Sequence, residues 1–405
     1  MKILYLDVVC KQGSTGKIVY DLYAQSRADG HTAAVCYGRG PVVAEENIFK
    51  FGLDWETRFH ALMTRLTGWT GCFSPLSTRR LIRFMEAFRP DVVHIHELHA
   101  YFVNLKPLLR YLAGKKIPVV HTLHCEFSYT GKCGHSYECQ RWKSGCGACP
   151  HLRDYPKTWW FDRTAAMWAE KKRLFSALDK LVVTVPSRWL ADRARQSFLG
   201  TREVCVVHNG IDTAHIFHPQ SCGHLREKYH IKPEEKVVLA VAPNLMSPQK
   251  GGRWVLKLAQ EMRQENIRFV LVGVSNLSEA FPPHVTAVGL IRDQEELAAH
   301  YSLADCFVIC SERETFSMTC AEAFCCGTPV AGFTAGGAVE TVPPPWGRFC
   351  SYGDVERLAE LVRETLARTP DPENAAAQGR ALYDKGVMYR AFRDIYEDLL
   401  GKGRL

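Results

Sequence analysis

The sequence predicts an α/β fold built from parallel sheets in two halves. Short apolar segments suited to buried strands alternate with helical segments, as in VVLAVA at 237–242 and RFVLVG at 268–273. Regular alternation of this kind is typical of parallel sheet flanked by helices. A chain of 405 residues is long enough for two such domains, each with its own core.

Composition and charge limit the classes of function. The chain is 46% hydrophobic and 23% charged, which is ordinary for a soluble globular protein. The net charge of +8 suggests an acidic surface or substrate. The sequence contains no long basic run and no RNA-binding signature, so nothing in it indicates a nucleic-acid partner. No apolar run approaches the length of a membrane span, and the start, MKILYLDVVC, resembles a strand more than a secretory leader, so we expect a cytoplasmic protein.

The most informative stretch is 311–340. It predicts a loop, a short helix that begins near Ser317 and stops at Gly327, and a following strand. Free N–H groups at the start of this helix would form an anion site, and Glu314 and Glu322 could accept hydrogen bonds from hydroxyls beside the anion. A polyol next to a phosphate indicates a nucleotide sugar. The alternative is an ordinary buried helix with two solvated glutamates.

A glycine turn, GSTGK at 13–17, follows the first predicted strand and opens an amphipathic helix. The turn does not match a P-loop, and it has too few glycines for a dinucleotide-binding pattern. A tight turn and a phosphate-binding turn are both compatible with this spacing. The second interpretation assigns contacts with the nucleotide sugar, the sugar donor, to Gly13, Ser14, Thr15, Gly16 and Lys17.

Two predicted strands of the first half end in histidine, DVVHIH at 91–96 and PVVHTLH at 118–124. Ligands of open α/β sheets bind beyond the carboxyl ends of the strands, so His96 and His124 lie where a functional site is expected. His94 and His96 have the spacing of one strand face, but no helical zinc motif accompanies them. We therefore expect no metal at this pair.

The region 55–89 mixes arginines with aromatic residues. Such a region can lie on an anionic membrane surface, or it can form a solvated basic face above a core face. The sequence leaves both interpretations open, and a lipid-linked acceptor would favour the first.

The segment 125–152 contains a cysteine cluster with the spacing C-x5-C-x6-C-x2-C. Its four thiolates could close a structural zinc site, with His135 and His151 as substitutes. Free thiols are the alternative, and a disulfide is disfavoured in a reducing compartment. The candidate ligands are Cys133, Cys139, Cys146 and Cys149.

Several motifs together carry a resemblance to a known family. The E-x7-E region continues as EAF-x-x-G-x-PV and ends in GG-x-x-E, which resembles the family 4 glycosyltransferases. The runs HTLH, TG-x-C and C-x-RWK-x-GC-x-x-CP narrow the resemblance to glycosyltransferases of colanic acid, capsule and exopolysaccharide assembly. The resemblance covers nearly the whole chain.

The resemblance implies the GT-B fold, in which two Rossmann-like domains face each other across a cleft. It predicts an acceptor-side domain at 1–208, a linker at 209–219 and a nucleotide-sugar domain at 220–385. Proline and a change in strand pattern support this boundary. The last helix, 386–405, is expected to pack back on the first domain.

The resemblance also implies which residues neutralise the negative charge of the donor diphosphate. Lys250 would neutralise the donor diphosphate. Asn244 stands where the family usually has an arginine, so Lys17 or Arg253 would contribute charge instead. No metal is expected in the chemistry.

Further roles follow from the same resemblance. Glu314 would position the sugar hydroxyls, Glu322 the ribose, and His124 the sugar near its reacting carbon. Other implied donor contacts are His96, Leu290, Ile291, Phe316, Ser317, Met318 and Thr319.

The expected activity is transfer of a hexose, with retention, from a nucleotide sugar such as a UDP-sugar to a lipid-linked glycan in surface polysaccharide assembly. The enzyme would work in the cytoplasm, at the inner face of the plasma membrane. A sugar-nucleotide hydrolase or epimerase would use similar donor contacts. A zinc-dependent binding or scaffold module would explain only the cysteines.

Overall fold

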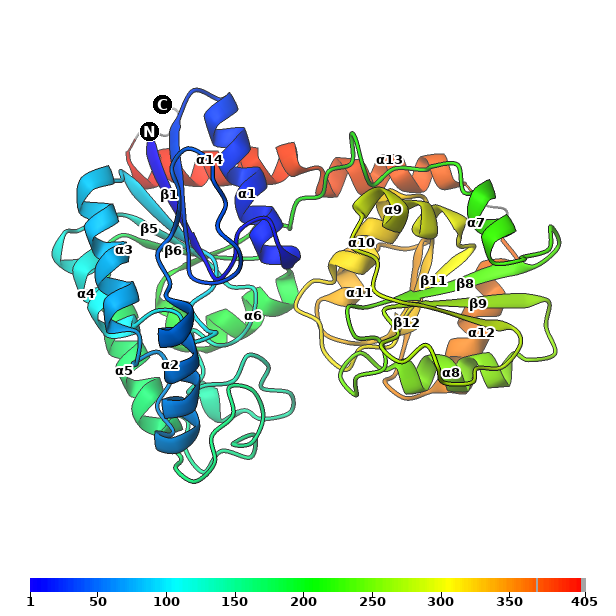
Figure 1. The fold of residues 1–405 in the computed structure, drawn as a ribbon, viewed down its shortest axis with the longest axis horizontal. Helices are drawn as coiled ribbons and strands as arrows, with labels where there is room; N and C mark the ends of the chain where they lie inside the picture. The colour runs from blue at the N-terminus through cyan, green and yellow to red at the C-terminus, as the bar shows by residue number, and fades with distance from the viewer. Residues whose placement is uncertain (369–370, 402–405) are drawn as a thin grey trace. The chain divides into compact units, whose positions relative to one another are not determined.

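The structure, a computed structural model, describes residues 1–368 and 371–401 (Figure 1). The chain forms two compact units. Unit 1 comprises Met1–Val207 and the chain from Met388 onward, and unit 2 comprises His208–Val387. Both units are α/β, as the sequence predicts. Among the described residues, no helix has the length and apolar character needed to cross a membrane.

Unit 1 contains a parallel sheet of seven strands in the order β3-β2-β1-β4-β5-β6-β7. The direction of strand addition changes between β1 and β4, where Leu6 lies opposite Ile95. In open α/β sheets, such a switch point is where ligands bind. The strands are β1 (Lys2–Asp7), β2 (Thr32–Tyr37), β3 (Ile48–Lys50), β4 (Val92–Ile95), β5 (Val119–Thr122), β6 (Leu181–Val185) and β7 (Glu203–Val206).

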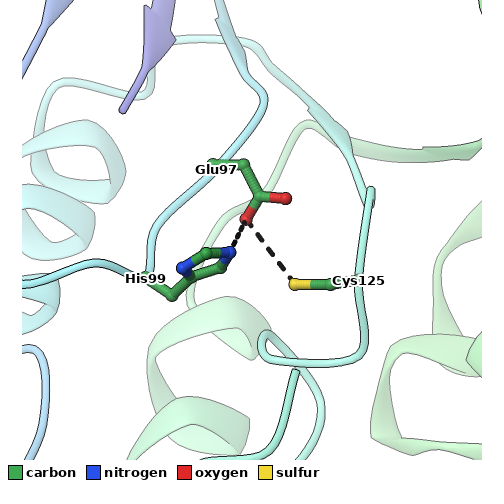
Figure 2. Close-up of side chains that lie close together, drawn as sticks. All are labelled: Glu97, His99 and Cys125. Atoms are coloured by element: carbon green, nitrogen blue, oxygen red, sulfur yellow. Dashed lines mark hydrogen bonds and ion pairs between the residues drawn. The ribbon is translucent and has the colours of Figure 1, made fainter. Parts of the chain in front are cut away.

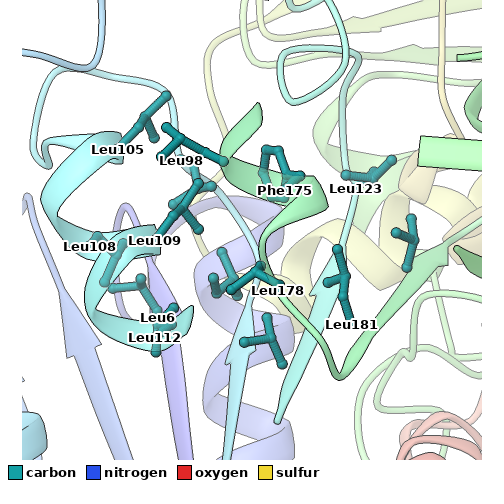
Figure 3. Close-up of a cluster of buried hydrophobic side chains, with 14 of the residues drawn as sticks. Leu6, Leu98, Leu105, Leu108, Leu109, Leu112, Leu123, Phe175, Leu178 and Leu181 are labelled. Carbon is teal, nitrogen blue, oxygen red and sulfur yellow. The ribbon is translucent and has the colours of Figure 1, made fainter. Parts of the chain in front are cut away.

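Helices bury the faces of this sheet. In α4, the leucines at 105, 108, 109 and 112 recur at helical spacing and pack beside Leu6 and Phe175 in one buried cluster (Figure 3). The helices are α1 (Gly13–Ala28), α2 (Asp54–Thr67), α3 (Pro75–Phe88), α4 (Leu105–Gly114), α5 (Thr164–Ser176) and α6 (Arg188–Gln196), with short 3-10 turns η1 (Arg141–Lys143) and η2 (Phe198–Thr201).

Helix α14 (Lys385–Leu399) supplies part of the core of unit 1. The Tyr396 hydroxyl lies 2.7 Å from His94 Nδ1, and the Tyr389 hydroxyl donates to Asp29 at 2.8 Å. The other ring nitrogen of His94 lies 2.6 Å from the Thr122 hydroxyl. His94 is therefore fully used inside the fold. Of the predicted helix 386–405, residues 402–405 lie outside the described residues.

Unit 2 contains a parallel sheet of six strands in the order β10-β9-β8-β11-β12-β13. These are β8 (Lys236–Val241), β9 (Ile267–Val272), β10 (Val285–Val288), β11 (Cys306–Ile309), β12 (Val330–Phe333) and β13 (Gly347–Cys350). Its helices are α7 (Gly223–Lys228), α8 (Gly252–Glu261), α9 (Gln294–Leu303), α10 (Met318–Cys325), α11 (Ala338–Thr341), α12 (Val355–Leu366) and α13 (Pro372–Tyr383). Two apolar clusters fill the space between the sheet and the helices.

Candidate active site

Helix α10 in unit 2 begins where the sequence predicts. Ser317 is its N-cap, and the Ser317 hydroxyl accepts a hydrogen bond from the Cys320 N–H at 3.4 Å. Ser317 has a positive φ of 84°, which is rare for a residue other than glycine and indicates local strain. At the other end, Gly327 has the left-handed backbone typical of a helix stop.

Lys250 and Glu314, predicted from separate motifs, form an ion pair. Lys250 Nζ lies 2.7 Å from Glu314 Oε1, and the two side chains are 34% and 18% exposed. Backbone bonds to Ala335 and Gly337 hold Glu314 in place. An ion pair with this exposure contributes at most about 1 kcal/mol, so an incoming anion can displace the carboxylate at low cost.

The turn before α8 positions Lys250 for its ion pair with Glu314. Gly251 has φ of +74°, and a Cβ there would lie 2.0 Å from the Cys310 carbonyl oxygen, so only glycine fits. The Glu312 N–H donates to the Gln249 carbonyl at 2.9 Å and ties the turn to the loop after β11. The local geometry therefore depends on the KGG sequence.

Glu322 has a partner that the sequence did not indicate. The Tyr301 hydroxyl, buried on α9, donates to Glu322 Oε2 at 2.9 Å. Burial, together with the charge of Glu322, raises the pKa of Tyr301 well above its ordinary value. Tyr301 remains protonated and fixes the orientation of the carboxylate. In the sequence, Tyr301 has no feature that separates it from core tyrosines.

The other predicted donor residues of unit 2 follow the carboxyl ends of its strands. Asn244 is exposed after β8, and Leu290 is exposed after β10. The Arg253 guanidinium lies 4.7 Å from the centre of the Trp254 ring on α8. Phe316 is buried, while Ile291, Met318 and Thr319 are half-buried around the start of α10 and the end of β10.

The turn at 13–17 is the first turn of α1 in unit 1. Gly13 has φ of +64° and Ser14 is exposed, while Thr15 and Lys17 are half-buried. A Cβ at Gly16 would lie 2.9 Å from a methyl group of Val9, so the turn folds tightly against the end of β1. Both interpretations of this turn remain compatible with the geometry.

His96 and His124 form a stacked pair after β4 and β5. His96 Nδ1 lies 3.0 Å from His124 Nε2, and the ring planes differ by 14°. Burial, with the charges of neighbouring histidines, lowers the pKa of His96 well below its ordinary value, and burial also lowers the pKa of His124. The pair is therefore neutral at pH 7, with one ring donating to the other.

Asp7 ends β1 beside this pair and was not predicted. The side chain is fully buried, and neither carboxylate oxygen has a hydrogen-bond partner of normal geometry among the described residues. Burial, increased by the charge of Glu97, raises the pKa of Asp7 to about 7. Many apolar strands end in an acidic residue, so nothing in the sequence selects Asp7 as a site residue.

Glu97, His99 and Cys125 form a further cluster in the loops after β4 and β5 (Figure 2). Glu97 Oε2 lies 3.0 Å from His99 Nε2 and 3.6 Å from Cys125 Sγ. Burial opposes ionisation of both partners, but their mutual attraction raises the pKa of His99 well above its ordinary value and lowers that of Glu97. The result is a carboxylate and imidazolium pair.

The cysteine segment is mostly irregular, with η1 as its one short helical turn. All four candidate cysteines line a single cavity of about 20 Å³, which is room for one water-sized particle. The Gly131 N–H donates to Cys146 Sγ at 3.2 Å. A hydrogen bond between the thiols raises the pKa of Cys133 and lowers that of Cys149 to about 6. His151 pairs with Asp154 instead, at 2.9 Å.

The ligand atoms of Glu97, His99 and Cys125 all lie within 4.8 Å of one another. Among the described residues, they are the one group of three candidate metal ligands that is this compact. The four cysteines surround their cavity less closely.

Two family models match the chain. Residues 15–215 match the model described as Glycosyltransferase Family 4, and residues 235–368 match Glycosyl transferases group 1. A colanic acid biosynthesis glycosyl transferase of Escherichia coli (strain K12), WcaC, is 26% identical over 416 residues, which cover 98% of this chain and 100% of that protein.

Solved structures share the fold. Sucrose-phosphate synthase from Thermosynechococcus elongatus superposes with a TM-score of 0.70 at 17% identity, covering 99% of each chain. Anabaena Alr3699/HepE, solved in complex with UDP and glucose, gives a TM-score of 0.66 at 17% identity, covering 98% of this chain and 99% of that one. The two parallel-sheet units thus have the GT-B fold.

With this fold and these two domain matches, the protein is a glycosyltransferase. More specifically, its first half carries a Glycosyltransferase Family 4 domain and its second half a Glycosyl transferases group 1 domain.

Proposed function

We propose that this enzyme transfers a hexose, with retention, from a UDP-sugar to a lipid-linked glycan during assembly of a surface polysaccharide. The Lys250 and Glu314 ion pair beside the start of α10 carries this proposal, because it sets a cation and a hydroxyl acceptor next to a helix N-terminus. The similarity to WcaC supports a role in polysaccharide assembly. The fold shared with the UDP complex of HepE supports a UDP-sugar.

The charge of the donor explains why both elements are needed. A helix N-terminus stabilises a nearby anion by at most about 2 kcal/mol, which cannot hold and discharge a diphosphate alone. Lys250 would supply the cation once the phosphate displaces Glu314. Glu314 would then be released to accept hydrogen bonds from the sugar hydroxyls.

The proposed chemistry needs no carboxylate nucleophile. The bond from the anomeric carbon to the phosphate oxygen breaks, and the acceptor oxygen bonds to that carbon on the same face. The acceptor proton passes to an oxygen of the leaving phosphate. Lys250 and the first N–H groups of α10 stabilise the charge on the departing nucleotide, and loss of one such donor typically raises the barrier by about 3 to 4 kcal/mol.

A panel of sugar nucleotides, incubated with the protein and membrane lipid extract, tests this function. The expected product is a lipid whose mass increases by one hexose. Glu314→Ala serves as the matched inactive variant. A donor consumed at full rate without any acceptor would instead identify a hydrolase or epimerase.

We also propose that Cys133, Cys139, Cys146 and Cys149 hold a structural zinc ion. They share one cavity, and the irregular segment around them has little secondary structure of its own to stabilise it. The Gly131 N–H bond to Cys146 Sγ is the kind of contact that supports a bound thiolate.

Metal analysis of the purified chain is expected to give one zinc per molecule. Cys146→Ser should lose the metal and lower the melting temperature by about 5 °C or more, because metal binding then no longer stabilises the fold. Cys72→Ser, at an exposed cysteine outside the segment, is the control. A zinc-free wild-type chain with four titratable thiols here would contradict the site.

A further inference from the structure

The Glu97 and His99 ion pair has no role in the donor chemistry, yet it lies at the carboxyl edge of the unit 1 sheet beside His124. Its position after β4 is next to the strand switch point, where open α/β sheets bind ligands. Figure 2 shows both side chains on the loop after β4 and Cys125 on the loop after β5. His99 Nδ1 is buried and has no hydrogen-bond partner of normal geometry among the described residues, although the Tyr155 side chain lies close enough to interact with the His99 ring. The pair therefore keeps an unused hydrogen-bonding position.

Two tyrosines continue this cluster. The Tyr155 ring packs edge-on against both His99 and Tyr101, with ring centres 5.9 and 5.8 Å apart, and is 53% exposed. Ala100 and Tyr101 both have positive φ, at 74° and 67°. Consecutive left-handed residues other than glycine cost about 1 to 3 kcal/mol each and concentrate at ligand-binding sites. An exposed ring beside a charged hydrogen-bonding pair suits a sugar ring.

Two arginines lie close to the same tyrosines. Burial raises the pKa of Tyr101 to about 12, and the charges of Arg65 and Arg39 act against that rise. The charge of Arg39 also opposes the rise in the pKa of Tyr155 that burial causes. The Arg39 guanidinium donates a hydrogen bond to the Ala100 carbonyl at 3.4 Å. Among the described residues, neither arginine forms an ion pair with a carboxylate. Arginine binds phosphate groups through two parallel hydrogen bonds.

An exposed apolar surface begins at Arg65. The Trp159 N–H donates to the Arg65 carbonyl at 2.9 Å. A Cβ at Gly68 would lie 2.3 Å from the Phe161 carbonyl oxygen, so the segment 159–161 packs tightly on the end of α2. The exposed residues of this surface are Trp55, Phe59 and Leu62 on one face of α2, and Trp159, Trp160 and Phe161.

We propose that these features form one binding track for a prenyl-diphosphate-linked saccharide, with its terminal sugar on Glu97, His99 and Tyr155, its diphosphate on Arg39 and Arg65, and its prenyl chain on the apolar surface of α2 and 159–161. The track lies entirely within unit 1. The inference rests on the proposed function, since it assigns the acceptor of that reaction.

The order of the groups favours this occupant over a plain bilayer. A bilayer surface would need only basic and apolar residues. It would not explain why the Glu97 and His99 ion pair, the strained loop at 100–101 and the Tyr155 ring lie beside the two arginines. The exposed apolar residues of α2 run from Trp55 to Leu62, about 11 Å along the helix, and the segment 159–161 adds to this length, which suits a short prenyl chain.

The first test measures binding of farnesyl diphosphate to the full chain by calorimetry. Arg39→Ala and Arg65→Ala are expected to weaken binding at least tenfold, while Arg110→Ala, at an exposed arginine on α4, leaves it unchanged. Phe59→Ala and Trp160→Ala should weaken binding of farnesyl diphosphate but not of inorganic diphosphate. Thermal unfolding of each variant checks that it is folded.

The second test concerns the sugar position. Glu97→Gln and His99→Gln are expected to leave farnesyl diphosphate binding unchanged, and to remove the additional affinity for farnesyl diphosphate that carries glucose or galactose. Equal binding of the sugar-bearing and sugar-free ligands by the wild-type chain would overturn this part. So would one bound zinc that Cys125→Ser releases, because the cluster would then be a metal centre.

Binding of a UDP-glucose probe to each variant separates this inference from the proposed function. Farnesyl diphosphate binding with no sugar nucleotide bound or consumed would contradict the proposed function alone. Normal donor use without farnesyl diphosphate binding would overturn the track. Binding to phosphatidylglycerol vesicles that is equally sensitive to Arg39 and Arg65 would reassign the surface to a bilayer.

Discussion

The carboxyl edges of the two sheets hold titratable groups in different states. In unit 2, Lys250 and Glu314 pair with each other while remaining partly exposed. In unit 1, Asp7 and His96 are buried, carry polar atoms without partners among the described residues, and have shifted pKa values. An exposed pair can exchange its partners for a ligand at low cost. The buried groups instead have protonation states set by burial, so they make the stability of the fold depend on pH.

The largest expected effect tests the exchangeable pair. Lys250→Ala and Glu314→Ala should each lower the rate of sugar transfer about 100-fold or more, because each removes a preorganised contact to the donor. The free energy of unfolding should change by no more than about 1 kcal/mol, since the pair is partly exposed. Transfer assays and urea titration measure the two effects. Lys257→Ala, on the exposed face of α8, is the control, and near-normal turnover in both variants would refute the donor site.

A second prediction concerns the buried acid of unit 1. Asp7 titrates near pH 7 in the folded chain, against 3.8 ordinarily. Between these values the unfolded chain has lost a proton that the folded chain still holds. The free energy of unfolding therefore falls as the pH rises from about 4 to 7, by up to about 4 kcal/mol, with no further change from this group at higher pH.

Asp7→Asn should remove this part of the pH dependence, whatever its effect at a single pH. Urea titrations at several pH values measure it, with Asp179→Asn at an exposed position as the control. Parallel curves for Asp7→Asn and the wild-type chain would mean that Asp7 is ionised in the folded state.

The smallest expected effect is a difference of about 2 kcal/mol between substitutions at two glycine turns. Gly251→Ala should lower the free energy of unfolding by about 3 kcal/mol, because left-handed strain adds to the clash with the Cys310 carbonyl. Gly13→Ala also has a positive φ but nothing within 4 Å of the new methyl group, so strain alone should cost about 1 kcal/mol. Urea titration compares them. Equal costs would show that the KGG turn can relax.

Local patterns predicted most elements of the fold. The helix at Ser317, its stop at Gly327 and the alternating apolar strands follow from short-range signals that the structure retains. Strands β3 and β13 were not predicted, because IFK and GRFC are short and only partly buried at the sheet edges. Such strands are defined by pairing with a neighbour, which a local pattern does not contain.

The candidate site was predicted only in part, for the same reason. Glu314 was identified from the predicted helix start and Lys250 from family resemblance, but their contact joins residues 64 positions apart. The cluster of Glu97 and Cys125 joins two loops 28 positions apart. Neither loop has a recognisable motif at these residues, so only the pairing of β4 with β5 shows that they meet. Tyr301 and Asp7 resemble core residues in sequence and differ only in their surroundings.

The return of α14 to unit 1 has a consequence for synthesis on the ribosome. The last strand of unit 1 ends at Val206, but Tyr389 and Tyr396, which contact Asp29 and His94, emerge only after all of unit 2. Since domains generally fold as they emerge, unit 1 must wait with its His94 face uncovered while nearly 200 further residues are made. A chain that stops before α14 would leave this face uncovered permanently, so release of the finished chain is the step that completes the core of unit 1.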